Sequence, residues 1–115
     1  MMRIVSISAA IALTAGAALA HHGWGSYDAA KPLTVTGPIL TSKFENPHAT
    51  ATVRDGDKTW TVTLAPTSRM SSRGANAQVV AVGKTISAYG YPSTVTRDEM
   101  RAERITVDGK TYEMR

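Results

Sequence analysis

Apolar and polar residues alternate along several short stretches of the chain, which is the pattern of β-strands that bury one face. The clearest pair of stretches covers residues 49–54 and 59–64, and the turn-forming sequence Asp55-Gly56-Asp57 separates them. This arrangement predicts a β-hairpin. The expected buried face of its second strand carries Trp60, Val62 and Leu64.

Three further stretches have strand character. Residues 33–45 are rich in β-branched and apolar side chains and contain a Gly37-Pro38 break, so they predict one long strand with a bulge or kink near the break. Residues 85–91 alternate again, and residues 100–107 predict a last long strand, after which a turn leads into residues 110–114. The inward positions of the strand at 85–91 are expected to be Ile86, Ala88 and Gly90.

A short helix is predicted between the third and fourth strands. Residues 69–74 suit one or two helical turns, and Gly74 is a typical stop signal. Five strands with a helix in this position indicate an all-β fold, a small five-stranded, partly open barrel of the OB type. An irregular small β-sandwich is the alternative. The barrel is expected to span residues 33–115 as a single domain.

Residues 21–32 predict an irregular N-terminal arm, because Gly, Ser, Asp and Pro are frequent in this segment. Trp24 and Tyr27 are its large side chains. They are expected to fix the arm to the barrel by burying aromatic surface, and lining a metal or ligand site is the alternative.

The first 20 residues, 1–20, have the features of a cleaved signal peptide. The segment begins with the basic residue Arg3, and an alanine-rich apolar run follows. The small residues Ala18 and Ala20 occupy positions −3 and −1 of the expected signal-peptidase cleavage site. Polar residues interrupt the run and no basic flank follows it, so a permanent membrane span is disfavoured. Cleavage after Ala20 would leave His21 as the first residue of a periplasmic or secreted protein, with no membrane association after signal cleavage.

Composition narrows the chemistry further. The chain has no cysteine, which excludes disulfides, thiolate metal sites and cysteine catalysis. Its formal net charge is +4, and its basic residues are scattered among acidic ones, so we interpret them mainly as solvated surface charges. Nucleic-acid binding would need a concentrated basic stripe with stacking aromatic residues, and it is therefore not expected.

The histidines carry the most specific chemistry. An N-terminal histidine offers two nitrogens, because its α-amine titrates near pH ~8 and its imidazole can close a chelate ring on the same metal. The chain's histidines are His21, His22 and His48, and a nitrogen-rich set of this kind favours Cu(II) over Ni(II) and Zn(II). We therefore expect a copper site made by His21 and His48, with His22 as a further ligand. Met70 is expected to be a core residue rather than a Cu(I) ligand.

Three alternatives to this site stay open. For His48 alone, the alternative is a capping or hydrogen-bonded histidine in a turn. In a second arrangement, the metal is bound by the α-amine of His21, the backbone amide between His21 and His22, and the imidazole of His22. A solvated histidine tail without function is the alternative to any site, because exposed termini often have no role.

Several short sequence motifs occur together in this chain: His21-His22-Gly23, residues 31–37, Asn46-Pro47-His48, Trp60, Gly83-Lys84 and Asp108-Gly109-Lys110. Together they resemble the DUF6152 family of small exported bacterial proteins, whose members likewise begin near a histidine pair and carry Asn-Pro-His after the first strand. The resemblance implies a compact exported β-domain and no established reaction. The chain departs from the family pattern after Leu64, where residues 73–76 lack the family's Gly-Trp.

These features favour a binding protein over an enzyme. Our first hypothesis is a periplasmic copper-binding domain. The alternative is an exported, non-enzymatic interaction or ligand-binding domain that holds a partner, such as a periplasmic protein, with Tyr89, Tyr91 or Arg97. Hydrolytic catalysis is disfavoured because no Ser-His-acid, phosphate-binding or paired metal-ligand motif is recognisable. Most of the carboxylates are expected in turns; they are Glu45, Asp55, Asp57, Asp98 and Glu99.

Overall fold

The computed structural model describes residues 23–115 of the chain, so the predicted signal peptide, His21 and His22 lie outside the described residues. In this range six strands and one short helix follow each other. They are β1 (Leu33–Lys43), β2 (Thr50–Asp55), β3 (Lys58–Thr63), α2 (Thr67–Ser72), β4 (Thr85–Pro92), β5 (Glu99–Val107) and β6 (Lys110–Glu113). Each predicted strand and the predicted helix are present, with boundaries shifted by a few residues.

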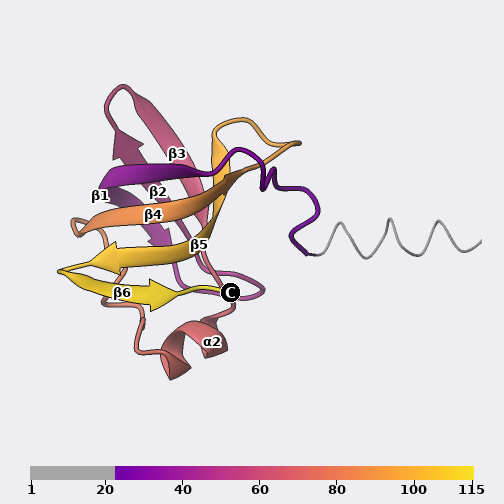
Figure 1. Cartoon of the computed structure of the whole chain (residues 1–115). Helices are drawn as coiled ribbons and strands as arrows, with labels where there is room; N and C mark the ends of the chain where they lie inside the picture. Colours follow the sequence, from indigo (N-terminus) through magenta and orange to yellow (C-terminus); the bar gives the residue numbers. More distant parts are fainter. Residues whose placement is uncertain (1–22) are drawn as a thin grey trace, which may run out of the picture.

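Five of the strands close into a barrel (Figure 1). The sheet order is β3-β2-β1-β4-β5-β6, and β3 also pairs with β5. Neighbours along the sheet are antiparallel, whereas β3 and β5 run parallel where they close the barrel. Closure pairs residues 61–63 of β3 with residues 99–101 of β5 and so covers an edge that an open sheet would expose. This order, with the helix between β3 and β4, is that of an OB-type barrel and confirms the predicted fold class.

The strand β1 is long because it pairs with two neighbours in succession. Its first part, residues 33–38, pairs with β4, and the part from Ile39 onward pairs with β2. The register with β2 shifts between Ile39 and Thr41, and Leu40 is exposed at this bulge. The predicted irregularity is therefore present, just after the Gly37-Pro38 break. A bulge bends the strand and lets both parts join the curved wall.

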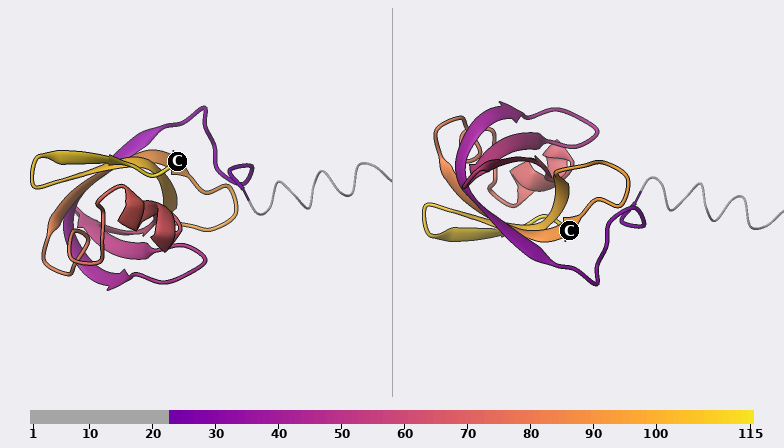
Figure 2. Two further views of the ribbon diagram at one scale, coloured as in Figure 1. Left: turned by 90° about the horizontal axis from the view of Figure 1, so that it is seen from below. Right: turned by 90° about the horizontal axis from the view of Figure 1, so that it is seen from above.

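The interior of the barrel is a core of mainly aliphatic side chains. Its largest fully buried members are Ile39, Leu64, Met70, Ile86, Met100, Ile105, Met114, Val35, Val53, Val62 and Val80. Seen from below, α2 lies across the end of the barrel, and its Met70 is part of the core (Figure 2). Met70 is thus the core residue that the sequence predicted. Trp60 is half-buried at the edge of the core, while Val62 and Leu64 lie inside it. Within residues 23–115, no helix is long and apolar enough to cross a membrane.

The strand β6 adds a hairpin to β5 outside the closed barrel. It buries Tyr112 and Met114 against the core. The end of the chain is then tied to α2, because Arg69 donates a hydrogen bond to the backbone oxygen of Met114 over 3.1 Å. Arg73 donates to the backbone oxygen of Arg115 over 2.8 Å. The C-terminal segment is therefore anchored at the helix end of the barrel.

The close approach of β4 to β5 at Gly90 is testable. A Cβ atom at this position would overlap the backbone carbonyl of Arg101. We expect Gly90→Ala to lower the free energy of unfolding by about 1–3 kcal/mol, the usual cost of overpacking, in a denaturant titration. Ser87→Ala on the same strand is the matched control and should cost less than ~1 kcal/mol. An unchanged unfolding free energy for Gly90→Ala would contradict the close packing of these two strands.

Candidate functional site

Arg101 lies on β5 with its side chain on the outer side of the barrel wall. Met100 and Ala102 are in the core, so the alternation of the strand turns Arg101 outward. Arg101 is nevertheless only 7% exposed, because Gly23 and Trp24 of the arm contact its guanidinium group. The described part of the arm, residues 23–32, lies at the side of the barrel, next to the loop between β4 and β5 (Figure 1). The interpretation of the basic residues as solvated surface charges is therefore wrong for Arg101.

The guanidinium group of Arg101 joins the arm to the loop between β1 and β2, residues 44–49. Its Nη1 donates a hydrogen bond to the backbone oxygen of Gly23 over 3.2 Å. Its Nη2 lies 3.2 Å from Nε2 of His48. The same group lies over the ring of Trp24, 4.2 Å from the ring centroid. One side chain on the barrel therefore contacts the beginning of the arm and the predicted histidine ligand.

Trp24 is the central aromatic anchor of the arm. Besides Arg101 it contacts the guanidinium group of Arg115, which lies 4.5 Å from the ring centroid. The rings of Tyr27 and Tyr91 meet Trp24 edge-on, with centroids 6.3 Å and 6.0 Å away. Each cation–π contact is worth about 0.5–2 kcal/mol. The prediction that Trp24 and Tyr27 fix the arm to the barrel is confirmed.

Tyr27 forms the second anchor through a hydrogen bond to Glu99. Its hydroxyl donates to Oε2 of Glu99 over 2.6 Å, and the hydroxyl of Thr63 donates to the same oxygen over 2.7 Å. Burial, followed by the hydrogen bond to Glu99 and its charge, raises the pKa of Tyr27 to about 12. The phenol therefore stays protonated at neutral pH and remains a donor.

Backbone hydrogen bonds complete the docking of the arm. The amide of Asp28 donates to the carbonyl of Pro92 over 2.9 Å, and the amide of Thr94 donates to the carbonyl of Ser26 over 2.9 Å. Between these bonds Tyr27 forms a β-bridge with Ser93. The arm thus lies beside the loop that connects β4 to β5.

His48 is half-buried and held in its neutral form. Burial, together with the positive charges of Arg101 and Arg69, lowers the pKa of His48 below its ordinary value of 6.5. Since a guanidinium nitrogen can only donate, Nε2 of the neutral ring is the acceptor from Arg101, and we assign the ring proton to Nδ1. At neutral pH the imidazole therefore has one lone pair, and that lone pair faces Arg101.

A pocket of about 390 Å³ opens where the arm, the 44–49 loop and the barrel meet. Its lining residues are Gly23, Ser26, Tyr27, Pro47, His48, Thr63 and Arg101. Thr63 and Arg101 are partners in the parallel pairing of β3 with β5, so the pocket lies over the junction that closes the barrel. We name it the arm pocket. It is the candidate site because it combines a predicted ligand, His48, with a buried charge.

The remaining predicted residues have different positions. His21 and His22 lie outside the described residues, two and one positions before Gly23. Within residues 23–115, no cluster of three or more His, Cys, Asp or Glu side chains could hold a metal ion. Tyr91 reaches the arm through Trp24, whereas Tyr89 packs against Tyr91 and Arg104. Arg97 is exposed in the loop between β4 and β5.

Sequence reasoning missed Arg101 and assigned Glu99 to a turn. Glu99 instead begins β5 and accepts hydrogen bonds from Tyr27 and Thr63. Arg101 has the outward position of an ordinary surface residue in the alternation of β5. Its burial depends on a segment more than seventy positions away, and no local pattern in the sequence reports such a contact.

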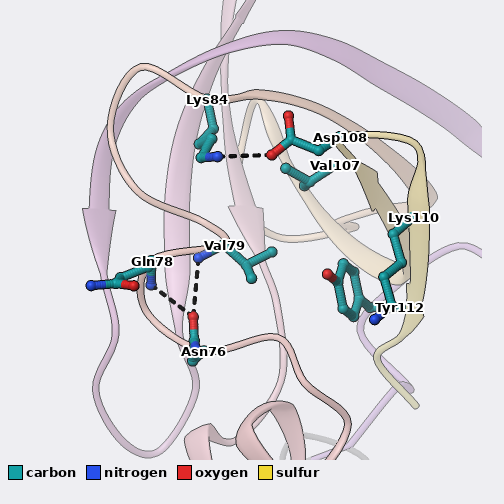
Figure 3. Close-up of a pocket in the computed structure, with 8 residues that line it drawn as sticks. All are labelled: Asn76, Gln78, Val79, Lys84, Val107, Asp108, Lys110 and Tyr112. Atoms are coloured by element: carbon teal, nitrogen blue, oxygen red, sulfur yellow. Dashed lines mark hydrogen bonds and ion pairs between the residues drawn. The ribbon is translucent and has the colours of Figure 1, made fainter.

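A second pocket, of about 310 Å³, lies between the segment before β4 and the β5–β6 hairpin (Figure 3). Two of its charged groups form an ion pair, Lys84 and Asp108 over 2.8 Å, and the ammonium group of Lys110 lies over the ring of Tyr112, 5.6 Å from the centroid. The side-chain oxygen of Asn76 accepts hydrogen bonds from the backbone amides of Gln78 and Val79. With these polar groups already paired, this pocket is a weaker candidate than the arm pocket.

The lowered pKa of His48 predicts how stability depends on pH. Above about pH 6.5 the ring is neutral in both the folded and the unfolded chain. As the pH falls through this value, the unfolded chain takes up a proton that the folded protein resists, so the free energy of unfolding falls. We expect His48→Gln to lose less stability than the wild type between about pH 7 and about pH 5 in parallel denaturant titrations. Parallel losses in the two proteins would contradict the neutral, buried state of His48.

Comparisons with known proteins address the fold and the family. The chain is similar to a solved crystal structure of TiaS in complex with a tRNA and ATP, with 14% sequence identity and a TM-score of 0.51. The match covers 70% of this chain and 19% of that one, so this chain spans about a fifth of the length of that protein and the likeness concerns the fold alone. No curated protein matches the chain. Residues 9–111 match the family of unknown function DUF6152, and the chain therefore belongs to that family.

Proposed function

We propose that this protein is an exported copper-binding domain whose metal site forms at the arm pocket. The proposed ligands are the α-amine and imidazole of His21, after signal cleavage, and the imidazole of His48. His22 is a further ligand in this scheme. The protein is proposed to act in the periplasm or outside the cell, and to bind its metal without catalytic turnover.

The observation that carries this proposal is the position of Gly23 beside His48. Both residues line the arm pocket, and Arg101 donates a hydrogen bond to each of them. An extended chain spans at most about 3.6 Å per residue, so His21 is separated from Gly23 by no more than about 7 Å of chain. This distance is compatible with a metal ion that joins the N-terminus to the 44–49 loop.

The neutral state of His48 also supports the proposal. A histidine binds a metal through a lone pair, and a protonated ring must first release its proton. Because its pKa is lowered, the ring of His48 is deprotonated at neutral pH without assistance from a metal. The N-terminal amine has an ordinary pKa near ~8, so a copper ion displaces its proton at modest cost.

Metal binding at His48 requires a rearrangement of Arg101. If copper uses Nε2, it takes the lone pair that now accepts a hydrogen bond from Arg101. If copper uses Nδ1, the ring proton moves to Nε2, which then faces another donor on Arg101. In both cases this hydrogen bond breaks. Copper heads the divalent affinity series, which makes it the metal best able to offset that cost.

The experiment compares Cu(II) binding by four forms of the mature protein and one control variant. They are the wild type beginning at His21, the same chain with one additional Gly before His21, His48→Ala and His22→Ala. We expect the additional Gly and His48→Ala each to weaken binding at least about tenfold, with the loss of nitrogen hyperfine structure from the paramagnetic spectrum. Ser87→Ala, on the outside of β4, is the control and should bind like the wild type.

We expect intact-mass analysis of the exported protein to show a mature chain that begins at His21. Two outcomes would contradict the proposal. If the additional Gly and His48→Ala leave the affinity unchanged, any copper binding is a property of the exposed tail. If cleavage occurs at another bond, His21 has no α-amine to offer. The interaction-domain hypothesis would then be the one to pursue.

A further inference from the structure

We propose that the arm pocket binds a small molecule through a carboxylate group, with Arg101 as its anchor. This binding site does not depend on the copper site and requires only residues that the structure describes. The Arg101 side chain is buried outside the barrel wall beneath the arm.

Arg101 is a buried charge without a counter-ion. Within residues 23–115, its guanidinium group has no carboxylate oxygen within 4.0 Å, and residues 1–22 contain no Asp or Glu. The nearby carboxylate of Glu99 accepts hydrogen bonds from Tyr27 and Thr63 instead. Burying a charge without a partner is costly, and buried arginines are normally paired.

The charges around Arg101 leave a positive excess. The positive charges of Arg69 and Arg115 repel the guanidinium group of Arg101, whereas the negative charge of Glu99 attracts it. Arg115 has its own ion pair with Glu103, over 3.2 Å. Arg69 donates to the backbone oxygen of Met114 and not to a carboxylate. An anion at the arm pocket would therefore meet a favourable electrostatic field.

The hydrogen-bonding geometry points to a carboxylate. The Nε atom of Arg101 is buried and has no hydrogen-bond partner within the described part of the chain. Nε and Nη2 share one edge of the guanidinium group, the edge that holds a carboxylate with two parallel hydrogen bonds. Nη2 now donates to the ring of His48, which lines the pocket. A ligand carboxylate at this edge would accept from the Nε–H group and from one of the two N–H groups of Nη2.

The pocket has the size and lining for a small organic acid. Its volume of about 390 Å³ exceeds what a single ion needs. Tyr27 and Pro47 also line the pocket, and their side chains contain apolar surface that a short carbon chain could contact. Ser26 lines the same pocket, and its hydroxyl group is a further hydrogen-bonding group for the ligand. The ligand class is therefore a small aliphatic carboxylate.

The competing explanation is that Arg101 has a purely structural role. Its guanidinium group lies 4.2 Å from the ring centroid of Trp24, and this cation–π contact partly stabilises the buried charge in place of a counter-ion. In that case the side chain fixes the arm and binds no ligand. The two explanations differ in what happens to the Nε–H group of Arg101 when a carboxylate is added.

The experiment is an NMR titration of the mature protein with acetate and with succinate, in the presence of a metal chelator. Sodium chloride and sodium phosphate at matched ionic strength are the comparison titrations. We expect saturable shifts of the Arg101 Nε–H, the Trp24 indole N–H and the His48 ring with the carboxylates. Arg101→Lys should weaken binding at least about tenfold, since lysine lacks the two-donor edge. Arg104→Lys, an exposed arginine on the same strand, is the matched control and should bind like the wild type.

Shifts that never saturate, that chloride reproduces, or that occur with phosphate and not with carboxylates would exclude a carboxylate site. Because Arg101→Lys also removes a contact to the arm, the Nε–H resonance of the wild type serves as the direct readout. If that resonance does not move with either carboxylate, Arg101 serves the arm alone.

Discussion

A positive charge buried outside the barrel wall is the constraint on which the site depends. Arg101 points away from the core, and the arm covers it. A guanidinium group in that position must find hydrogen-bond acceptors and aromatic faces, because water no longer solvates it fully. It finds the carbonyl of Gly23, the ring of Trp24 and Nε2 of His48. Arg101 therefore both fixes the arm and orients the 44–49 loop that carries His48.

The barrel could be predicted from the alternation of side chains, and the site could not. Strand alternation is a local pattern, so the hairpin of β2 and β3, the long β1 and the strand β4 were accessible from the sequence alone. The parallel pairing of β3 with β5 and the position of the arm depend on distant contacts. Arg101 and Glu99 gain their roles from those contacts. Trp24 and Tyr27 were accessible as anchors because large aromatic residues in an irregular segment need a surface to cover.

The two ligands that we propose for the arm pocket, a copper ion and a carboxylate, would both bind next to the Arg101–His48 hydrogen bond. A metal at His48 would require this bond to break, and a carboxylate on the Nε and Nη2 edge would bind through the same nitrogen, Nη2. An anion bound to Arg101 would neutralise the positive charge that disfavours a metal cation at His48. Copper and carboxylate binding are therefore expected to assist each other at this site rather than to compete.

The central claim, that Arg101 holds the arm against the barrel, is tested most directly by amide hydrogen exchange in Arg101→Met. The amides of Asp28 and Thr94 donate hydrogen bonds across the junction of arm and barrel, so their protection reports whether the arm is docked. We predict that both amides lose protection in the variant while core amides such as those of Ala88 and Ile105 keep theirs. If Asp28 and Thr94 remain protected, Tyr27 and the backbone hold the arm without Arg101, and the account of the site is wrong.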